Sequence, residues 1–312
     1  MVRHFPPQET ATTLLAPELA ARVRRIHVRT HKLVNTALSG GYRSTFRGQG
    51  VEFEEVRPYQ PGDDVRSIDW NVTARTGEPH VKNYREEREL TLALLVDTGL
   101  SMDFGTRRWT KREAAAQLAA LVSFVALAHQ DRVGLTLFGA EPGLHLEPRK
   151  DSRHVLRIVR EVIAAPVSPS RSDLGEVLRQ TGRTLRRRSL VFLFSDFLAN
   201  ESGDEWGRPL ARLARRHDVI AVRLVDPFEE DLPEAGLFRA QELGAGRGIE
   251  LDTRSRAVRD AWRAAAEERR ARWLSVLSRA RVERIEVDIR QNLAEPLVEF
   301  FHRREVRHRG GR

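Results

Sequence analysis

Two aspartates and two serines of this sequence have the types and positions that could hold a metal ion. Asp97 ends the apolar run "LTLALLVD", and Asp196 ends the apolar run "SLVFLFSD". A carboxylate at the end of a buried strand is destabilising unless it meets a cation, hydrogen-bond donors or water. Ser101 follows Asp97 across a glycine, and Ser172 begins the segment "SDLGEVL". Carboxylate and hydroxyl oxygens are the ligands that Mg²⁺ prefers, so the four side chains predict a site for Mg²⁺, or else for Mn²⁺ or Ca²⁺.

Each of these residues also has an ordinary structural use. Asp97 can be a solvated carboxylate at a strand end, and Ser101 and Ser172 can cap the N-termini of helices. A third carboxylate, Asp226, ends the run "DVIAVRLVD", but in "VDPF" it is expected to form a turn rather than to bind an ion. The metal-binding and structural interpretations therefore both stand.

The elements that must bring these side chains together are strands and helices in alternation. Strand-like apolar runs are "LTLALLVD", "RVGLTLFG", "SLVFLFSD", "DVIAVRLVD" and "VERIEVDI", and helical patterns lie between them. This alternation predicts an α/β fold with an open, mostly parallel sheet and helices on both faces. Ligands of such sheets bind beyond the carboxyl ends of the strands. The segment "GLFRAQELGAGRGIELD" predicts a β-hairpin excursion from this fold.

Three parts of the chain differ in pattern. Residues 1–88 predict an amphipathic helix over 17–38, a glycine-rich loop, and a small α+β segment in which "VEFEEVRPY" pairs with "EPHVKNYREERE". Residues 89–302 form the α/β domain, and residues 303–312 are expected to be a disordered basic tail. The charged residues around the "PGDD" turn predict a buried web of ion pairs that joins the small segment to the sheet: Arg57, Asp63, Asp64, Arg66, Asp69 and Arg75.

The composition excludes several classes of protein. The 312 residues include no cysteine, which excludes thiol nucleophiles, thiolate zinc sites and disulfides. No apolar run is long enough to span a membrane and no secretory leader is evident, so a cytoplasmic protein is expected. The net charge is +9, but arginine supplies it almost alone and is scattered over the chain. A basic nucleic-acid-binding protein is therefore kept only as an alternative.

Short motifs within the α/β part resemble the von Willebrand factor A family. That family has a metal-ion-dependent adhesion site with the pattern Asp-x-Ser-x-Ser after its first strand, a threonine on a second loop and an aspartate on a third. Here "DTGLS" resembles the first element, "RSDL" the second and "FSDF" the third. Gly99 stands in place of one ligand serine, and water would fill that position. Replacing Gly99 with serine is expected to tighten the ion by roughly fivefold, or about 1 kcal/mol.

A longer stretch is similar to one branch, the domain of unknown function 58 family. Its signature is matched at nearly every position by "GQGVEFEEVRPYQPGDDVRSIDWNVTARTG", and the likeness extends over roughly residues 35–300. The resemblance implies a partner or adaptor of a MoxR-type AAA+ ATPase that acts in protein or complex assembly. It also implies that the ion leaves a coordination position for a carboxylate of a client protein.

Enzymatic activity is not expected, and no catalytic residue is assigned. The sequence has no Gly-x-Ser-x-Gly, no His-Glu-x-x-His and no P-loop. The alternative is a phosphohydrolase similar to the haloacid dehalogenases, with Asp97 and Ser195 in the active site. Such an enzyme usually has a second acid where Gly99 stands, and it needs a downstream lysine, for which only Lys111 and Lys150 remain beyond Asp97.

Overall fold

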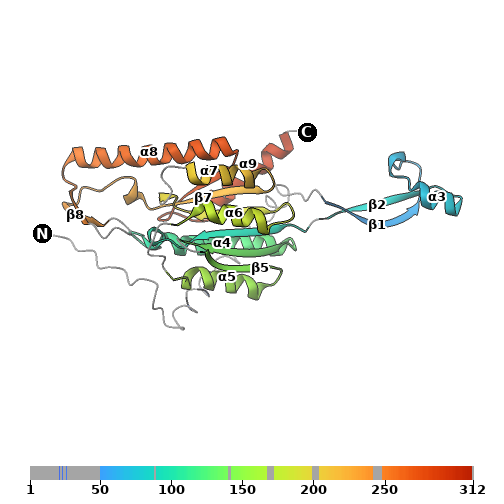
Figure 1. Ribbon diagram of the computed structural model, residues 1–312, viewed down its shortest axis with the longest axis horizontal. Helices are drawn as coiled ribbons and strands as arrows, with labels where there is room; N and C mark the ends of the chain where they lie inside the picture. The colour runs from blue at the N-terminus through green and yellow to red at the C-terminus, as the bar shows by residue number, and fades with distance from the viewer. Residues whose placement is uncertain are drawn as a thin grey trace. The chain divides into compact units, whose positions relative to one another are not determined.

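The computed structural model describes residues 50–87, 89–139, 142–166, 172–198, 204–241 and 248–310, together with helical positions at 21, 23 and 26. By its contacts the chain divides into a small unit, Phe46–Leu90, and a large unit that includes Thr91–Arg312. The predicted helix over 17–38 and the loop that follows it lie almost wholly outside the described residues. Figure 1 shows the elements of both units.

The small unit is a two-stranded ribbon with short helices between its strands. Strand β1 (Gly50–Pro58) pairs with antiparallel β2 (His80–Glu87), as the sequence predicts. Between them lie the 3₁₀ helix η3 (Val65–Ser67) and the helix α3 (Trp70–Thr76). Asp69 caps α3 by accepting hydrogen bonds from two backbone N–H groups of its first turn.

The ion pairs that the structure describes around the "PGDD" turn lie within the small unit, and a web that joins this unit to the sheet stays a prediction. Arg57 donates two hydrogen bonds of 2.7 Å to Asp63, and Lys82 lies 3.2 Å from Asp69. Asp64 caps η3 by accepting from the backbone of Arg66. The described pairs join residues of the small unit to one another, and Arg57 and Asp63 remain partly exposed.

The large unit contains a six-stranded sheet in the order β10-β7-β6-β3-β4-β5. The strands are β3 (Thr91–Asp97), β4 (Arg132–Phe138), β5 (Pro142–Arg149), β6 (Leu190–Ser195), β7 (Asp218–Val225) and β10 (Glu283–Asp288). Neighbouring strands are parallel except for β5, which is antiparallel to β4. The predicted fold class, α/β with a mostly parallel sheet, is therefore confirmed. The edge strand β5 was not predicted from the sequence.

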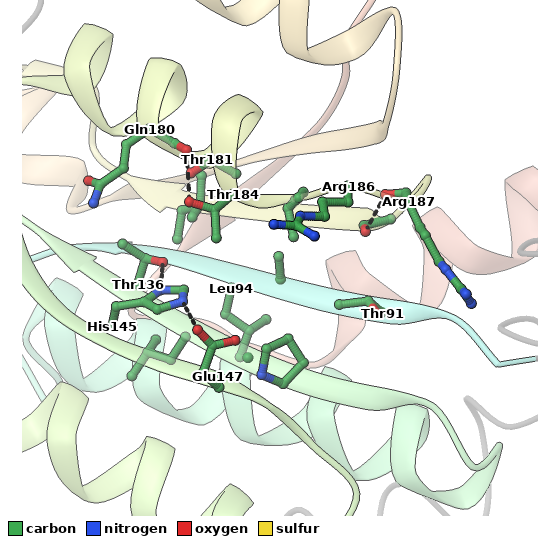
Figure 2. A pocket seen from close by; sticks show the side chains of 17 residues that line it. Thr91, Leu94, Thr136, His145, Glu147, Gln180, Thr181, Thr184, Arg186 and Arg187 are labelled. Atoms are coloured by element: carbon green, nitrogen blue, oxygen red, sulfur yellow. Dashed lines mark hydrogen bonds and ion pairs between the residues drawn. The ribbon is translucent and has the colours of Figure 1, made fainter.

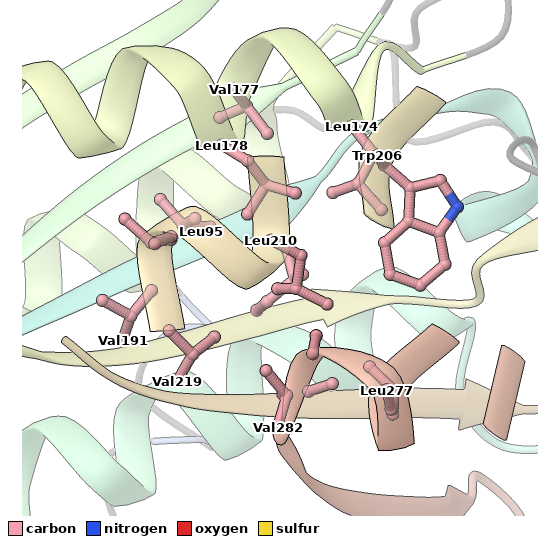
Figure 3. Packing of buried hydrophobic residues seen from close by; sticks show 14 of the residues in the cluster. Leu95, Leu174, Val177, Leu178, Val191, Trp206, Leu210, Val219, Leu277 and Val282 are labelled. Carbon is pink, nitrogen blue, oxygen red and sulfur yellow. The ribbon is translucent and has the colours of Figure 1, made fainter. Parts of the chain in front are cut away.

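Helices lie on both faces of this sheet. They are α4 (Lys111–Ala128), α5 (Ser152–Ala164), α6 (Leu174–Thr184), α7 (Asp204–Ala214), α8 (Arg256–Ala280) and α9 (Glu295–Gly310). Figure 3 shows α6, α7 and α8 contributing Leu178, Leu210 and Leu277 to a core with Val191 of β6. Phe192, the next residue along β6, points to the other face, where its ring centroid lies 6.5 Å from that of Phe301 in α9.

The C-terminal part of the chain differs from the prediction. Residues 303–310 continue α9 instead of forming a disordered tail. Arg304 anchors this end of the helix, because its guanidinium lies 2.7 Å from carboxylate oxygens of both Asp218 and Glu283. The predicted hairpin is confirmed: β8 (Leu237–Gln241) pairs with antiparallel β9 (Gly248–Asp252). Within the described parts of the chain, no helix combines the length and the apolar character needed to cross a bilayer.

Phe197 connects the core to the loop that carries Asp196. Its ring centroid lies 5.7 Å from that of Trp206 in α7 and 5.5 Å from that of Trp273 in α8. Its φ is 59°, a left-handed conformation that side chains with a Cβ rarely adopt. The ring therefore holds the backbone in a strained conformation immediately beyond β6.

At position 197 a glycine substitution should destabilise the protein less than an alanine substitution, which is the reverse of the usual order of stability. Phe197→Ala is expected to lower the free energy of unfolding by about 3–5 kcal/mol, because the buried ring is lost. Phe197→Gly should lower it by about 1 kcal/mol less, because glycine adopts a positive φ without strain. Urea denaturation of the two variants measures the difference, and a glycine variant less stable than the alanine variant would contradict a strained backbone here.

Candidate functional site

The predicted site lies where the strand order reverses. From β3 the sheet is extended in one direction by β4 and β5, and in the other direction by β6, β7 and β10. The carboxyl ends of β3 and β6 are therefore neighbours at the point where doubly wound sheets bind ligands. Asp97 is the last residue of β3, Ser195 is the last residue of β6, and Asp196 follows it.

Asp97 is a buried carboxylate that meets neutral donors. Its Oδ1 accepts hydrogen bonds from the backbone N–H of Gly99 at 2.8 Å and from the hydroxyl of Ser172 at 2.5 Å. Its Oδ2 accepts from the hydroxyl of Ser195 at 2.6 Å. Burial, with the nearby charge of Asp196, raises the pKa of Asp97 to about 6 against the pull of these donors. The described residues form no ion pair with Asp97.

Asp196 is equally buried but has a cationic partner. Its Oδ2 lies 2.6 Å from Nζ of Lys111, and its Oδ1 accepts from the backbone N–H of Leu198 at 3.0 Å. The hydroxyl of Ser101 donates to the same carboxylate. Burial opposes ionisation, but the ammonium of Lys111 and these donors hold the pKa of Asp196 below its usual value.

Lys111 and Glu229 belong to the cluster and were not assigned to it from the sequence. The Lys111 side chain is completely buried, and its Nζ also lies 2.6 Å from Oε1 of Glu229. The sequence around Lys111 does indicate that this residue lies at the start of a helix. Thr110 and Glu113 form a capping box, which makes Lys111 the first residue of α4.

Asp226 has a wider structural role than the predicted turn. It caps the 3₁₀ helix η6 (Pro227–Glu229) by accepting from the backbone of Phe228. It also accepts from the backbone N–H of Thr106 at 2.6 Å and from the hydroxyl of Thr106 at 2.8 Å. Asp226 therefore fastens the segment that follows the 3₁₀ helix η4 (Leu100–Asp103) to the end of β7.

The structure brings all four residues predicted as ligands into one cluster. Ser172 bonds to Asp97, and Ser101 bonds to Asp196. Neither serine caps a helix as the alternative interpretation had it. Asp173 is the cap of α6, and Gly99 stands at the cap position of η4.

The charges of this cluster would be better balanced with a cation bound than without one. Asp97 lacks a positive partner among the described residues, while a serine hydroxyl that donates to a carboxylate keeps its lone pairs for an ion. Within the part of the chain that the structure describes, no group of three or more acidic or histidine side chains could hold a metal. An ion here would therefore depend on the hydroxyls of Ser101 and Ser172 as well as on the two aspartates.

Gly99 allows the close contact between Ser172 and Asp97. A Cβ at position 99 would lie 2.6 Å from Oγ of Ser172 and 3.1 Å from Oδ1 of Asp97. The backbone does not require glycine, because φ is −59° and ψ is 159°. A serine at this position would therefore displace the Ser172 hydroxyl rather than simply add a ligand.

The described pocket with a volume of about 370 Å³ is separate from this cluster. It lies toward the opposite end of the strands, where Thr91 begins β3 and Ser189 precedes β6. Figure 2 shows His145 between two partners there: its Nδ1 lies 2.9 Å from the hydroxyl of Thr136, and its Nε2 lies 3.5 Å from Glu147. None of the predicted ligands lines this pocket.

The pH dependence of stability should reveal the buried Asp97. Between pH 3.8 and about 6 the folded protein retains a proton that the unfolded chain has lost. Stability should therefore fall as the pH rises through this range, by up to about 3 kcal/mol from this residue. Asp97→Asn should flatten the profile, which urea denaturation at a series of pH values measures. The control Asp173→Asn removes the exposed carboxylate beside Ser172 and should keep the wild-type slope.

The contact at Gly99 changes the outcome expected for a serine there. Gly99→Ser should lower the free energy of unfolding by about 1.5–3 kcal/mol, because the bond from Ser172 to a buried carboxylate is lost. It should not tighten Mg²⁺, in contrast to the expectation from the sequence. Denaturation and titration calorimetry provide the two measurements, and a variant that binds Mg²⁺ fivefold more tightly than the wild type would show that this steric argument fails.

Comparisons with known proteins agree with the signature in the small unit. The family described as "Protein of unknown function DUF58" matches residues 55–272. "Uncharacterized protein Rv1480" of Mycobacterium tuberculosis and "Uncharacterized protein Mb1516" of Mycobacterium bovis are each 34% identical over 270 residues, which cover 85% of this chain and 83% of the relative.

Similar solved structures include two that are much more distant in sequence. The conserved hypothetical protein BatB from Bacteroides thetaiotaomicron is 14% identical, with a TM-score of 0.44 over 70% of this chain and 99% of BatB. The SpRpn10 VWA domain is 10% identical, with a TM-score of 0.35 over 67% of this chain and 94% of that domain.

Proposed function

Since this chain belongs to the DUF58 family, we propose that it is a non-catalytic protein-binding module of the von Willebrand factor A kind, whose binding depends on a divalent ion. The observation that supports this most directly is the buried carboxylate of Asp97, which meets three neutral donors and no cation among the described residues. A MoxR-type AAA+ ATPase is the proposed partner, and its support is the family resemblance of the signature stretch.

The aspartates and the serines of the cluster would contribute different kinds of ligand to the ion. Asp97 and Asp196 would supply negative charge, while Ser101 and Ser172 would supply neutral oxygen ligands. When bound, Mg²⁺ would supply an open coordination position for a carboxylate of the partner. The loops that carry these residues are anchored by the core through Phe197 and by the bonds between Asp226 and Thr106, so the ligands are held before any ion binds.

A second candidate is the phosphohydrolase, and one observation favours it. Lys111, one of the two lysines that remain beyond Asp97, lies 2.6 Å from Asp196, and Ser195 donates to Asp97. Against it, both oxygens of Asp97 already accept short hydrogen bonds, so the carboxylate is poorly placed to act as a nucleophile. Gly99 also leaves no second acid two residues beyond Asp97.

The partner proposal predicts binding that requires both the ion and Asp97. The full chain should retain the MoxR-type ATPase of the same genome in a pull-down with nucleotide and Mg²⁺, and should lose it with a chelator or as Asp97→Ala. Asp173→Ala is the matched control, because it removes a neighbouring exposed carboxylate at a cost of about 1 kcal/mol in helix capping and should still bind. Equal retention by all three proteins with and without the ion would contradict a metal-dependent interface.

A phosphatase assay separates the two candidates. Under the binding proposal, a generic phosphate ester incubated with the protein and Mg²⁺ should be hydrolysed no faster than in buffer. Turnover that disappears in Asp97→Asn, while the fold is retained by circular dichroism, would favour the phosphohydrolase.

A further inference from the structure

The buried ammonium of Lys111 lies beside the proposed ion site. Its Nζ is 2.6 Å from Oδ2 of Asp196 and 2.6 Å from Oε1 of Glu229, and the side chain is completely buried. Its position is fixed by the backbone, because the N–H of Lys111 donates to the carbonyl of Phe104 at 3.0 Å. A cation is therefore already held against one of the two aspartates that an ion would use.

The two aspartates consequently differ in what they offer a second cation. The donors on Asp97 are two hydroxyls and one backbone N–H, all neutral. Asp196 has an ammonium on one oxygen and a backbone N–H on the other. An ion entering the cluster meets an uncompensated charge at Asp97 and a charge at Asp196 that is already paired.

We infer that Lys111 competes with the divalent ion for Asp196, and that this competition sets a low affinity for the ion. The inference rests on the proposed metal site and adds to it a positioning residue that touches one ligand. Because Lys111 pairs with Asp196, less negative charge is available to the ion, and a carboxylate from a partner would make up for this. The ion and the partner would therefore each bind more tightly when the other is bound.

A purely structural role for Lys111 has different consequences. The ion pairs with Asp196 and Glu229 join α4 to the end of β6 and to η6, so any neutral substitution should lower stability under either role. Competition for Asp196 predicts that Mg²⁺ affinity rises when this ammonium is removed, and rises by more than when a neighbouring buried charge is removed. The readout must therefore be ion binding as well as stability.

The test compares Lys111→Met with Arg112→Met. Arg112 is the next residue of α4, is also buried, and pairs with Asp103 at 2.5 Å and with the carbonyl of Ala165, so its variant removes an adjacent buried charge without touching Asp196. In titration calorimetry with MgCl₂ alone, Lys111→Met should bind about tenfold more tightly than the wild type, which is about 1.4 kcal/mol. Arg112→Met should bind as the wild type does, and Mg²⁺ should raise the Tm of Lys111→Met by more than that of the other two proteins.

The outcomes distinguish this inference from the proposed function. If Lys111→Met binds Mg²⁺ and the wild type does not, the competition stands and the metal-dependent function of the native protein fails. If the wild type binds and Lys111→Met binds no more tightly, the function stands and the competition is overturned. Tightening of the same size in Arg112→Met, or no ion bound by any of the proteins, also overturns it.

A second variant decides the matter if Lys111→Met does not fold. Glu229→Gln retains the size of the side chain but leaves Asp196 as the sole carboxylate on the ammonium. Lys111 should then hold Asp196 more strongly, and the affinity for Mg²⁺ should fall by about threefold or more. An unchanged or tighter affinity in Glu229→Gln would overturn the competition.

Discussion

Two neighbouring carboxylates lie out of water at the centre of the sheet, and the surrounding chain must compensate for their burial. Asp97 and Asp196 end adjacent parallel strands and are both buried, so each disfavours the ionisation of the other. The surrounding chain meets this constraint in two ways. It surrounds Asp97 with neutral donors from three segments, and it brings the ammonium of Lys111 to Asp196 from the first turn of α4.

A few residues at the ends of the strands join the hydrophobic core to the site. Phe197 is packed between the rings of two tryptophans while its backbone completes a hydrogen bond to Ser195. Asp226 fixes the segment that precedes α4 through Thr106. The loops that carry these side chains are therefore held by residues of the interior, as the proposed ion-binding site would require.

The sequence predicts the position of a site residue most reliably when that residue ends an apolar strand. Asp97 and Asp196 follow runs that are buried on both faces, so their place at one edge of the sheet follows from the alternation of strands and helices. Lys111 could not be placed in the same way, because a lysine at a helix start is usually solvated and its burial depends on tertiary packing. Strand β5 was missed because "PGLHLEPR" contains two prolines, which are tolerated at a sheet edge. Helix α9 was missed because its basic residues resemble a tail, although Phe300 and Phe301 are buried.

The contacts of Lys111 also have a consequence for the kinetics of folding. Its two carboxylate partners are 85 and 118 residues away along the chain, so the ion pairs form only after α4, β6 and η6 have come together. Contacts of such long range close large loops and are expected to be completed after the transition state for folding. Stabilising this cluster, by an ion or by a partner, should therefore slow unfolding and leave the folding rate almost unchanged. On this expectation the cluster would set the lifetime of the native state rather than the speed of reaching it.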